Sequence, residues 1–114
     1  RWEYEYARYL SVMKHRGQIA EWSYEPTTFI FHEIPFGTRS YTPDFIVRSL
    51  DGTEAYHEVK GWMTPRAKTQ LSRMKKFYPD IPIMLIDGSI MRSLIYPVLK
   101  HENMSQLPLR IVKA

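Results

Sequence analysis

The sequence contains no cysteine among its 114 residues, and this absence removes several classes of protein at once. A disulfide-stapled scaffold, a cysteine-ligated zinc ribbon and a thiol nucleophile are all excluded. Long apolar runs are missing too, because the longest, residues 81–86, is broken by Pro82 and falls far short of the roughly 18 residues that a membrane span needs. Eight prolines and five glycines are too few for a disordered chain. We therefore expect a single folded domain over 1–114 with its own hydrophobic core.

Acidic residues are absent from one stretch, residues 59–79, although the whole chain carries a formal net charge of only +4. This stretch holds six basic side chains, namely Lys60, Arg66, Lys68, Arg73, Lys75 and Lys76. Such a segment is either a solvated face or a surface for an acidic partner, and the charges alone leave both interpretations open. No signal-peptide pattern opens the chain, and the lack of cysteine fits a reducing compartment, so we expect a cytoplasmic protein.

Hydrophobic periodicity predicts an α/β fold with the order α-β-β-β-α-β, in which helices flank a mixed central sheet. The predicted elements are a helix over 1–16, strands within 22–31, over 41–47 and over 55–60, a helix over 65–78, a strand over 81–86, a short helix over 89–96 and a last strand over 107–112. The apolar run at 81–86 is typical of a strand covered on both faces.

Local signals fix several of these boundaries. Gly17 is expected to end the first helix, and Asp51-Gly52 predicts a hairpin between the second and third strands. Thr64 is expected to cap the second helix, with Pro65 at its first position. Pro97 is expected to interrupt the third helix.

The hairpin predicts a pair of carboxylates. Asp44 and Glu58 each stand seven residues from Asp51, so pairing of the strands can place them opposite each other, close enough to share a cation. Glu58 and Lys60 are two residues apart on one strand and therefore point to the same face. Two carboxylates suit Mg²⁺ or Mn²⁺, and a neighbouring lysine can orient a water or offset charge on a phosphate. The alternative is an ordinary exposed Glu-x-Lys pair.

Pro43-Asp44, followed fourteen residues later by Glu58-Val59-Lys60, resembles the PD-(D/E)xK nuclease superfamily. More narrowly, residues 41–45 (YTPDF) and 57–62 (HEVKGW) resemble small phage endonucleases of the endonuclease I or Holliday-junction-resolvase-like type. The resemblance extends from the first helix to about Ile86. It implies a restriction-endonuclease-like core and a Mg²⁺-dependent DNA endonuclease, with Mn²⁺ able to substitute, that acts on branched or Holliday-junction DNA in phage or bacterial recombination. If a phage encodes the chain, the compartment is the cytoplasm of the bacterial host.

The resemblance also implies roles for individual residues. Asp44 and Glu58 would be metal ligands, with the backbone carbonyl of Val59 as a third donor, and Lys60 would be the catalytic lysine.

Many members of the superfamily add a glutamate from the first helix. Glu3 is the preferred candidate because Tyr6, Ala7 and Leu10 follow it at the spacing seen in similar proteins, and Glu5 is the reserve.

The second helix predicts the surface for nucleic acid, because Lys and Arg contacts to phosphates give affinity that is independent of sequence. The candidate DNA-binding residues are Arg39, Arg66, Lys68, Gln70, Ser72, Lys75 and Lys76. For Trp62 we weigh base stacking against packing in the core and expect packing, and His57 should point to the face opposite Glu58. A homodimer is possible, with the apolar segment 90–99 as its candidate surface.

Two other functions stay open. One is a catalytically inactive nuclease fold used for DNA binding or assembly, and the other is a cutter of the transposase or restriction type.

Overall fold

The computed structural model describes residues 2–102, so the strand predicted over 107–112 lies outside the described part. The elements are α1 (Trp2–His15), β1 (Glu21–Tyr24), β2 (Phe29–Ile30), β3 (Ser40–Tyr41), β4 (Phe45–Arg48), β5 (Glu54–Val59), α2 (Pro65–Phe77), β6 (Ile83–Ile86), α3 (Gly88–Ile90), the π-helix η1 (Met91–Ile95) and α4 (Tyr96–Lys100). Within residues 2–102 no helix combines the length and the apolar character that a membrane crossing requires.

A four-stranded mixed sheet forms the centre, as predicted. Its strand order is β1-β4-β5-β6, with antiparallel β1/β4 and β4/β5 pairs and a parallel β5/β6 pair. The parallel pair needs a crossover connection, and α2 supplies it. The predicted α-β-β-β-α-β order is therefore present as α1, β1, β4, β5, α2 and β6, with the small β2-β3 sheet inserted after β1.

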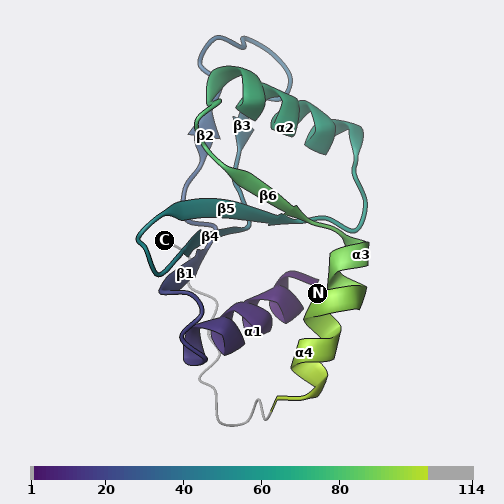
Figure 1. The fold of residues 1–114 in the computed structure, drawn as a ribbon. Helices are drawn as coiled ribbons and strands as arrows, with labels where there is room; N and C mark the ends of the chain where they lie inside the picture. The colour runs from purple at the N-terminus through teal and green to yellow at the C-terminus, as the bar shows by residue number, and fades with distance from the viewer. Residues whose placement is uncertain (1, 103–114) are drawn as a thin grey trace.

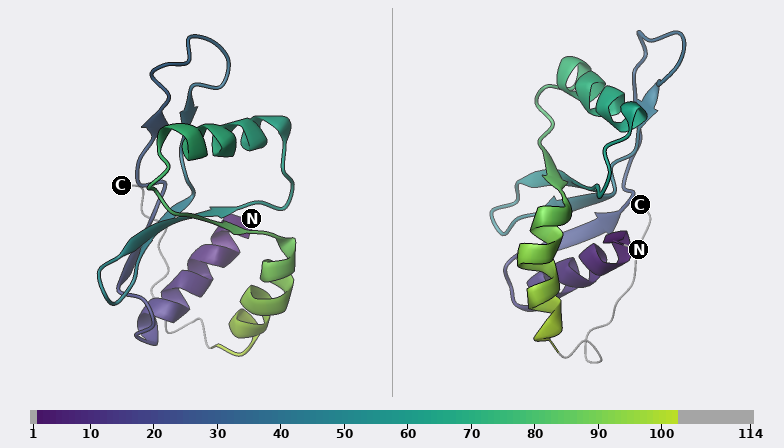
Figure 2. Two further views of the ribbon diagram at one scale, coloured as in Figure 1. Left: turned by 45° about the horizontal axis from the view of Figure 1, so that its top comes forward. Right: turned by 90° about the vertical axis from the view of Figure 1, so that its right-hand side faces the viewer.

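Helices cover the two faces of this sheet unequally (Figures 1 and 2). The helix α1 and the helical segment 88–100 lie on one face, and α2 lies on the other side. The main core fills the space under α1 and includes Tyr6, Leu10, Met13, Phe45, Val47, Val59, Ile86, Met91, Ile95 and Leu99. A smaller cluster of Phe31, Tyr41 and Met74 packs beneath α2. Because side chains alternate along β5, Val59 enters the main core while Glu58 faces the α2 side.

The helix boundaries follow the local signals. Gly17 has a positive φ of 72° and donates to the carbonyl of Lys14, while Gln18 donates to that of Met13, which is a Schellman ending. At the start of α2, Thr64 is the N-cap and its hydroxyl accepts a hydrogen bond of 3.1 Å from the Ala67 N–H. Both predicted boundaries are confirmed.

Two predicted strands are shorter than expected. The segment 22–31 divides into β1 and β2, and the segment 41–47 divides into β3 and β4 around Pro43. Proline has no N–H to give to a ladder, so a strand of a sheet ends there. The interruption lets β3 pair with β2 while β4 pairs with β1 and β5, and it leaves Asp44 just outside β4.

The expectation that segment 81–86 is covered on both faces holds for only part of it, since Ile86 is buried in the main core and Ile83 packs against the cluster beneath α2. Among the described residues β6 pairs only with β5 and forms one edge of the sheet. Met84 is 52% exposed and Leu85 is also exposed, because no further strand or helix of the described chain covers them. An apolar run predicts burial only when a layer is present on each side of the strand.

The expectation that Pro97 ends the third helix is wrong. The helix continues through η1 into α4, because the backbone widens to a π-turn in which the Tyr96 N–H bonds the Met91 carbonyl. An α-helical turn would press the proline ring against the carbonyl four residues earlier, and the wider turn relieves that clash.

The segment 90–99, considered as a dimer surface, mostly serves the core of the chain itself. Its residues Met91, Ile95 and Leu99 are buried against α1.

Candidate functional site

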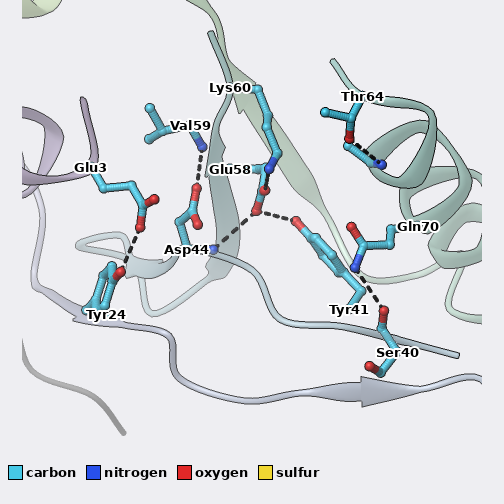
Figure 3. A network of polar contacts seen from close by, with 11 residues as sticks. Glu3, Tyr24, Ser40, Tyr41, Asp44, Glu58, Val59, Lys60, Thr64 and Gln70 are labelled. Carbon is cyan, nitrogen blue, oxygen red and sulfur yellow. Dashed lines mark hydrogen bonds and ion pairs between the residues drawn. The ribbon is translucent and has the colours of Figure 1, made fainter. Parts of the chain in front are cut away.

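The β4–β5 hairpin brings Asp44 and Glu58 together, as its turn predicts. Phe45 pairs with His57, so Asp44 lies opposite Glu58 at the next position of the register. The Asp44 N–H donates to Glu58 Oε1 at 3.2 Å, and the Val59 N–H donates to Asp44 Oδ2 at 2.8 Å. Figure 3 shows the two carboxylates at this end of the strands.

Glu58 is not an ordinary surface glutamate, since it is only 3% exposed. Its Oε1 also accepts a hydrogen bond of 2.7 Å from the Tyr41 hydroxyl, and its Oε2 lies 3.1 Å from Lys60 Nζ. Lys60 itself is half-buried and lies on the same face of the sheet (Figure 3). The prediction that these two charged side chains share a face is confirmed, and the interpretation as an exposed pair is wrong.

Asp44 is 9% exposed, and its surroundings disfavour its ionised form. Burial, together with the charges of Glu58 and Glu3, raises the pKa of Asp44 to about 7, although the hydrogen bond from Val59 and the charge of Lys60 act in the opposite direction. The two carboxylates therefore form a buried negative pair that the surrounding protein does not fully compensate.

Glu3 approaches this pair from the first turn of α1. Its carboxylate accepts a hydrogen bond of 2.7 Å from the Tyr24 hydroxyl of β1, and Figure 3 shows it on the far side of Asp44 from Glu58. Glu5 instead pairs with Arg8 at 3.3 Å within α1. Between the two candidates from the first helix, the structure places Glu3 near Asp44.

Two tyrosine hydroxyls hold the carboxylates, and the sequence analysis assigned them no role. Tyr41 holds Glu58 and Tyr24 holds Glu3. The pKa of Tyr41 is raised, mainly by burial and then by the charge of Glu58, and the pKa of Tyr24 is raised mainly by its hydrogen bond to Glu3. Both hydroxyls stay neutral, so they fix the carboxylates without cancelling their charge.

The indole of Trp2 anchors the first turn of α1 and was also missed. A Cβ on Gly61 would lie 2.7 Å from Trp2 Cζ3, and one on Gly88 would lie 3.1 Å from Trp2 Cη2. The ring therefore packs directly on the backbone just after β5 and just after β6. The signal in the sequence is a glycine directly after Lys60 and another near the end of β6, where close approach of a side chain requires the absence of a Cβ.

The donor chemistry of the site fits a hard divalent cation in part. Asp44 and Glu58 supply carboxylate oxygens, which Mg²⁺ and Mn²⁺ prefer. Within residues 2–102, however, no group of three or more His, Cys, Asp or Glu side chains is arranged to hold a metal ion. The structure therefore shows a carboxylate pair with a third carboxylate, Glu3, beyond Asp44.

The predicted DNA-binding residues lie mainly on the exposed side of α2, opposite the side that packs on Tyr41 and Phe31. The exposed members are Arg39, Arg66, Lys68, Ser72, Lys75 and Lys76. Gln70 is partly buried, and its amide donates to the Ser40 carbonyl at 3.0 Å, which ties α2 to β3 (Figure 3). Arg73 similarly donates to the Thr38 carbonyl.

His57 and Trp62 give opposite outcomes. His57 faces away from Glu58 and is hydrogen-bonded through Nδ1 to the Tyr6 hydroxyl at 2.6 Å, and burial lowers the pKa of His57 to about 4. The predicted orientation of His57 is confirmed. Trp62 is 78% exposed, so the expectation that it packs in the core is wrong, because the loop after β5 turns its side chain away from both hydrophobic clusters.

Comparison with known protein families, with curated proteins and with solved structures finds no match.

Proposed function

We propose that this chain is a metal-dependent DNA endonuclease with a restriction-endonuclease-like core. The observation that carries the proposal is the buried pair of Asp44 and Glu58 with the Lys60 ammonium 3.1 Å from Glu58. Buried carboxylates that repel each other are costly for a fold, and such groups concentrate at functional sites. The resemblance of the surrounding sequence to the PD-(D/E)xK nucleases supports the same assignment.

The proposed reaction is hydrolysis of a phosphodiester bond. A water oxygen forms a bond to phosphorus, one P–O ester bond breaks, and the water loses a proton while the leaving oxygen gains one. Asp44, Glu58 and the Val59 carbonyl would hold Mg²⁺, with Glu3 close by. When bound, the cation supplies positive charge that polarises the phosphate and promotes ionisation of a nearby water.

The residues of the chain itself supply orientation and charge. Tyr41 and the Asp44 N–H hold Glu58, and the Val59 N–H holds Asp44, so both carboxylates are fixed before a substrate arrives. Lys60 offers N–H donors and a positive charge to the water or to the phosphate oxygens as negative charge develops.

The basic side of α2 is proposed to hold the DNA backbone. Its exposed Lys and Arg side chains lie in the stretch of the sequence that contains no acid, so they contact phosphates without competing carboxylates from the same segment. We propose branched DNA as the substrate because of the family resemblance, and a homodimer where two strands must be cut.

The experiment is a cleavage assay with labelled duplex, flap, fork, four-way junction and single-stranded DNA in Mg²⁺ or Mn²⁺. We expect cleavage that EDTA abolishes and that Asp44→Asn or Lys60→Ala lowers by about 100-fold or more. Lys100→Ala, which removes an exposed lysine of α4, is the matched control and should cleave normally. Equal cleavage by Lys60→Ala and the parent protein contradicts the proposal, and cleavage of RNA alone overturns the choice of substrate.

A catalytically inactive DNA-binding or assembly module is the second candidate. The observation that favours it is that three donors of the chain, from Tyr41, Asp44 and Lys60, already satisfy Glu58. Thermal melting with and without Mn²⁺ separates the two functions. A cation site raises the melting temperature by mass action, whereas a module without one melts at the same temperature in both solutions.

A further inference from the structure

Trp62 lies in an unusual position for a tryptophan. It is 78% exposed although the residue type is normally well buried, and neither hydrophobic cluster includes it. An exposed indole adds nothing to the core, and its exposed face is open to a ligand.

The loop that carries Trp62 is fixed at both ends. The Lys60 N–H donates to the Ile86 carbonyl at 3.0 Å, and Gly61 packs on the Trp2 ring. At the other end, Thr64 caps α2 through its hydroxyl. The backbone that carries Trp62 is therefore held in place, which lowers the entropy cost of binding a ligand against its indole.

The charges around Trp62 indicate the ligand. Lys60 precedes it by two residues, and the exposed Arg66 and Lys68 follow in the first turn of α2, within the acid-free stretch 59–79. A flat aromatic side chain with cations before and after it in the sequence suits a ligand that has phosphate groups as well as a flat ring. A nucleotide whose base is accessible is such a ligand.

We propose that Trp62, two residues after Lys60, stacks on an unpaired base of the nucleic acid strand that the basic side of α2 holds. This inference rests on the proposed nuclease function for the identity of the strand, and it adds a substrate class. Bases within a duplex are stacked on each other and present no face to an indole, so the preferred substrate has unpaired nucleotides next to the cutting site, as a flap, fork or open junction does.

The test measures binding without cleavage. The full chain, in EDTA, is titrated with three labelled DNAs: a blunt duplex, the same duplex with an oligothymidine flap, and the same duplex with an abasic flap of equal length. The abasic flap keeps every phosphate and removes the bases.

The variants are Trp62→Ala, Trp62→Phe and, as the matched control, Phe36→Ala. Phe36 is 84% exposed and belongs to the β2–β3 loop, which lies above α2 in Figure 1 and not beside the end of β5.

For the wild-type chain we expect tighter binding to the thymidine flap than to the other two DNAs. Trp62→Ala should weaken binding to the thymidine flap by about 5- to 150-fold, the range that stacking on one base contributes, and should change binding to the duplex and the abasic flap by less than about twofold. Trp62→Phe should keep most of the preference because its ring still stacks, and Phe36→Ala should leave the preference unchanged.

Several results would overturn the proposal. Trp62→Ala could weaken binding to the abasic and thymidine flaps equally, which would assign Trp62 to general affinity. Phe36→Ala could cause the same loss as Trp62→Ala, which would make exposed aromatic side chains interchangeable. The tryptophan emission could instead shift with protein concentration before DNA is added in wild type but not in Trp62→Phe, which would show that a second copy covers the Trp62 ring. Binding to the blunt duplex as tight as binding to the thymidine flap refutes stacking alone, whereas no binding to any DNA refutes the nuclease function as well.

Discussion

Replacing Asp44 by Asn should stabilise the protein at neutral and alkaline pH while removing its proposed activity. The substitution keeps an oxygen to accept the hydrogen bond from the Val59 N–H, which is 2.8 Å from Asp44 Oδ2, and removes the negative charge beside Glu58. The change is therefore close to a pure test of the charge of this carboxyl group.

The magnitude follows from the pKa of Asp44, which is about 7 in the fold against an ordinary value of 3.8. Because the folded-state pKa is raised, the folded protein binds more protons than the unfolded chain between these two values, and stability falls as the pH rises through that window. At about 1.36 kcal/mol per pH unit, the ionised group costs on the order of 4 kcal/mol above pH 7. Relaxation around the new amide removes part of this gain, so we expect Asp44→Asn to be more stable by about 1–3 kcal/mol.

Urea unfolding near pH 8 and near pH 4.5 measures the effect. The gain from Asp44→Asn should be large near pH 8 and small near pH 4.5, where the wild-type carboxyl is already protonated in the fold. The matched control is Asp51→Asn in the exposed hairpin turn, where hydrogen bonds from Thr53 lower the pKa of the aspartate, so this variant should not gain stability. Equal or lower stability of Asp44→Asn near pH 8, or the same gain at both pH values, would refute the reasoning.

Four further predictions use the same contacts. Tyr41→Phe removes the 2.7 Å hydrogen bond to Glu58 and should cost about 1–2 kcal/mol in urea unfolding and lower kcat of cleavage more than it raises KM. Tyr24→Phe frees Glu3 from its 2.7 Å hydrogen bond and should weaken the Mn²⁺-dependent rise in melting temperature, with little change in melting temperature when no metal is present. Gly61→Ala places a methyl group 2.7 Å from the Trp2 ring and should lower the free energy of unfolding by about 1–3 kcal/mol. In the double variant the smaller ring of Trp2→Phe should recover part of that loss, and simple addition of the two single effects would disprove this coupling. His57 has a pKa of about 4 in the fold against 6.5 in the unfolded chain, so its contribution to stability falls by up to about 3 kcal/mol as the pH drops from 6.5 to 4. In His57→Gln this part of the dependence of stability on pH should be absent.

The parts of the fold that the sequence predicted are those set by neighbouring residues. The register that places Asp44 opposite Glu58 depends on the turn at Asp51-Gly52, and the ends of α1 and α2 depend on Gly17 and on Thr64. Each of these signals acts within a few residues, so it can be interpreted without knowing what lies across the molecule.

The incorrect predictions concern contacts between distant segments. Exposure of Met84 depends on whether a distant segment covers that position of β6, and exposure of Trp62 depends on where the loop after β5 turns. Pro97 is tolerated because the π-turn before it opens the helix, which residue preferences do not encode. The partnership of Tyr24 with Glu3 joins residues 21 positions apart through the packing of α1 on β1, so no local pattern predicts it.

The arrangement of charge at the site favours a functional origin over a structural one. A fold optimised only for stability would pair each buried carboxylate with a cation or replace it with an apolar side chain. Here Asp44 is held by a backbone N–H and Glu3 by a tyrosine hydroxyl, and only Glu58 has a cationic partner, Lys60. Neutral donors position negative groups while leaving their charge available, which is what the binding of an external cation requires. The stabilising effect expected for Asp44→Asn and the loss of cleavage expected for the same variant are therefore two consequences of one charge.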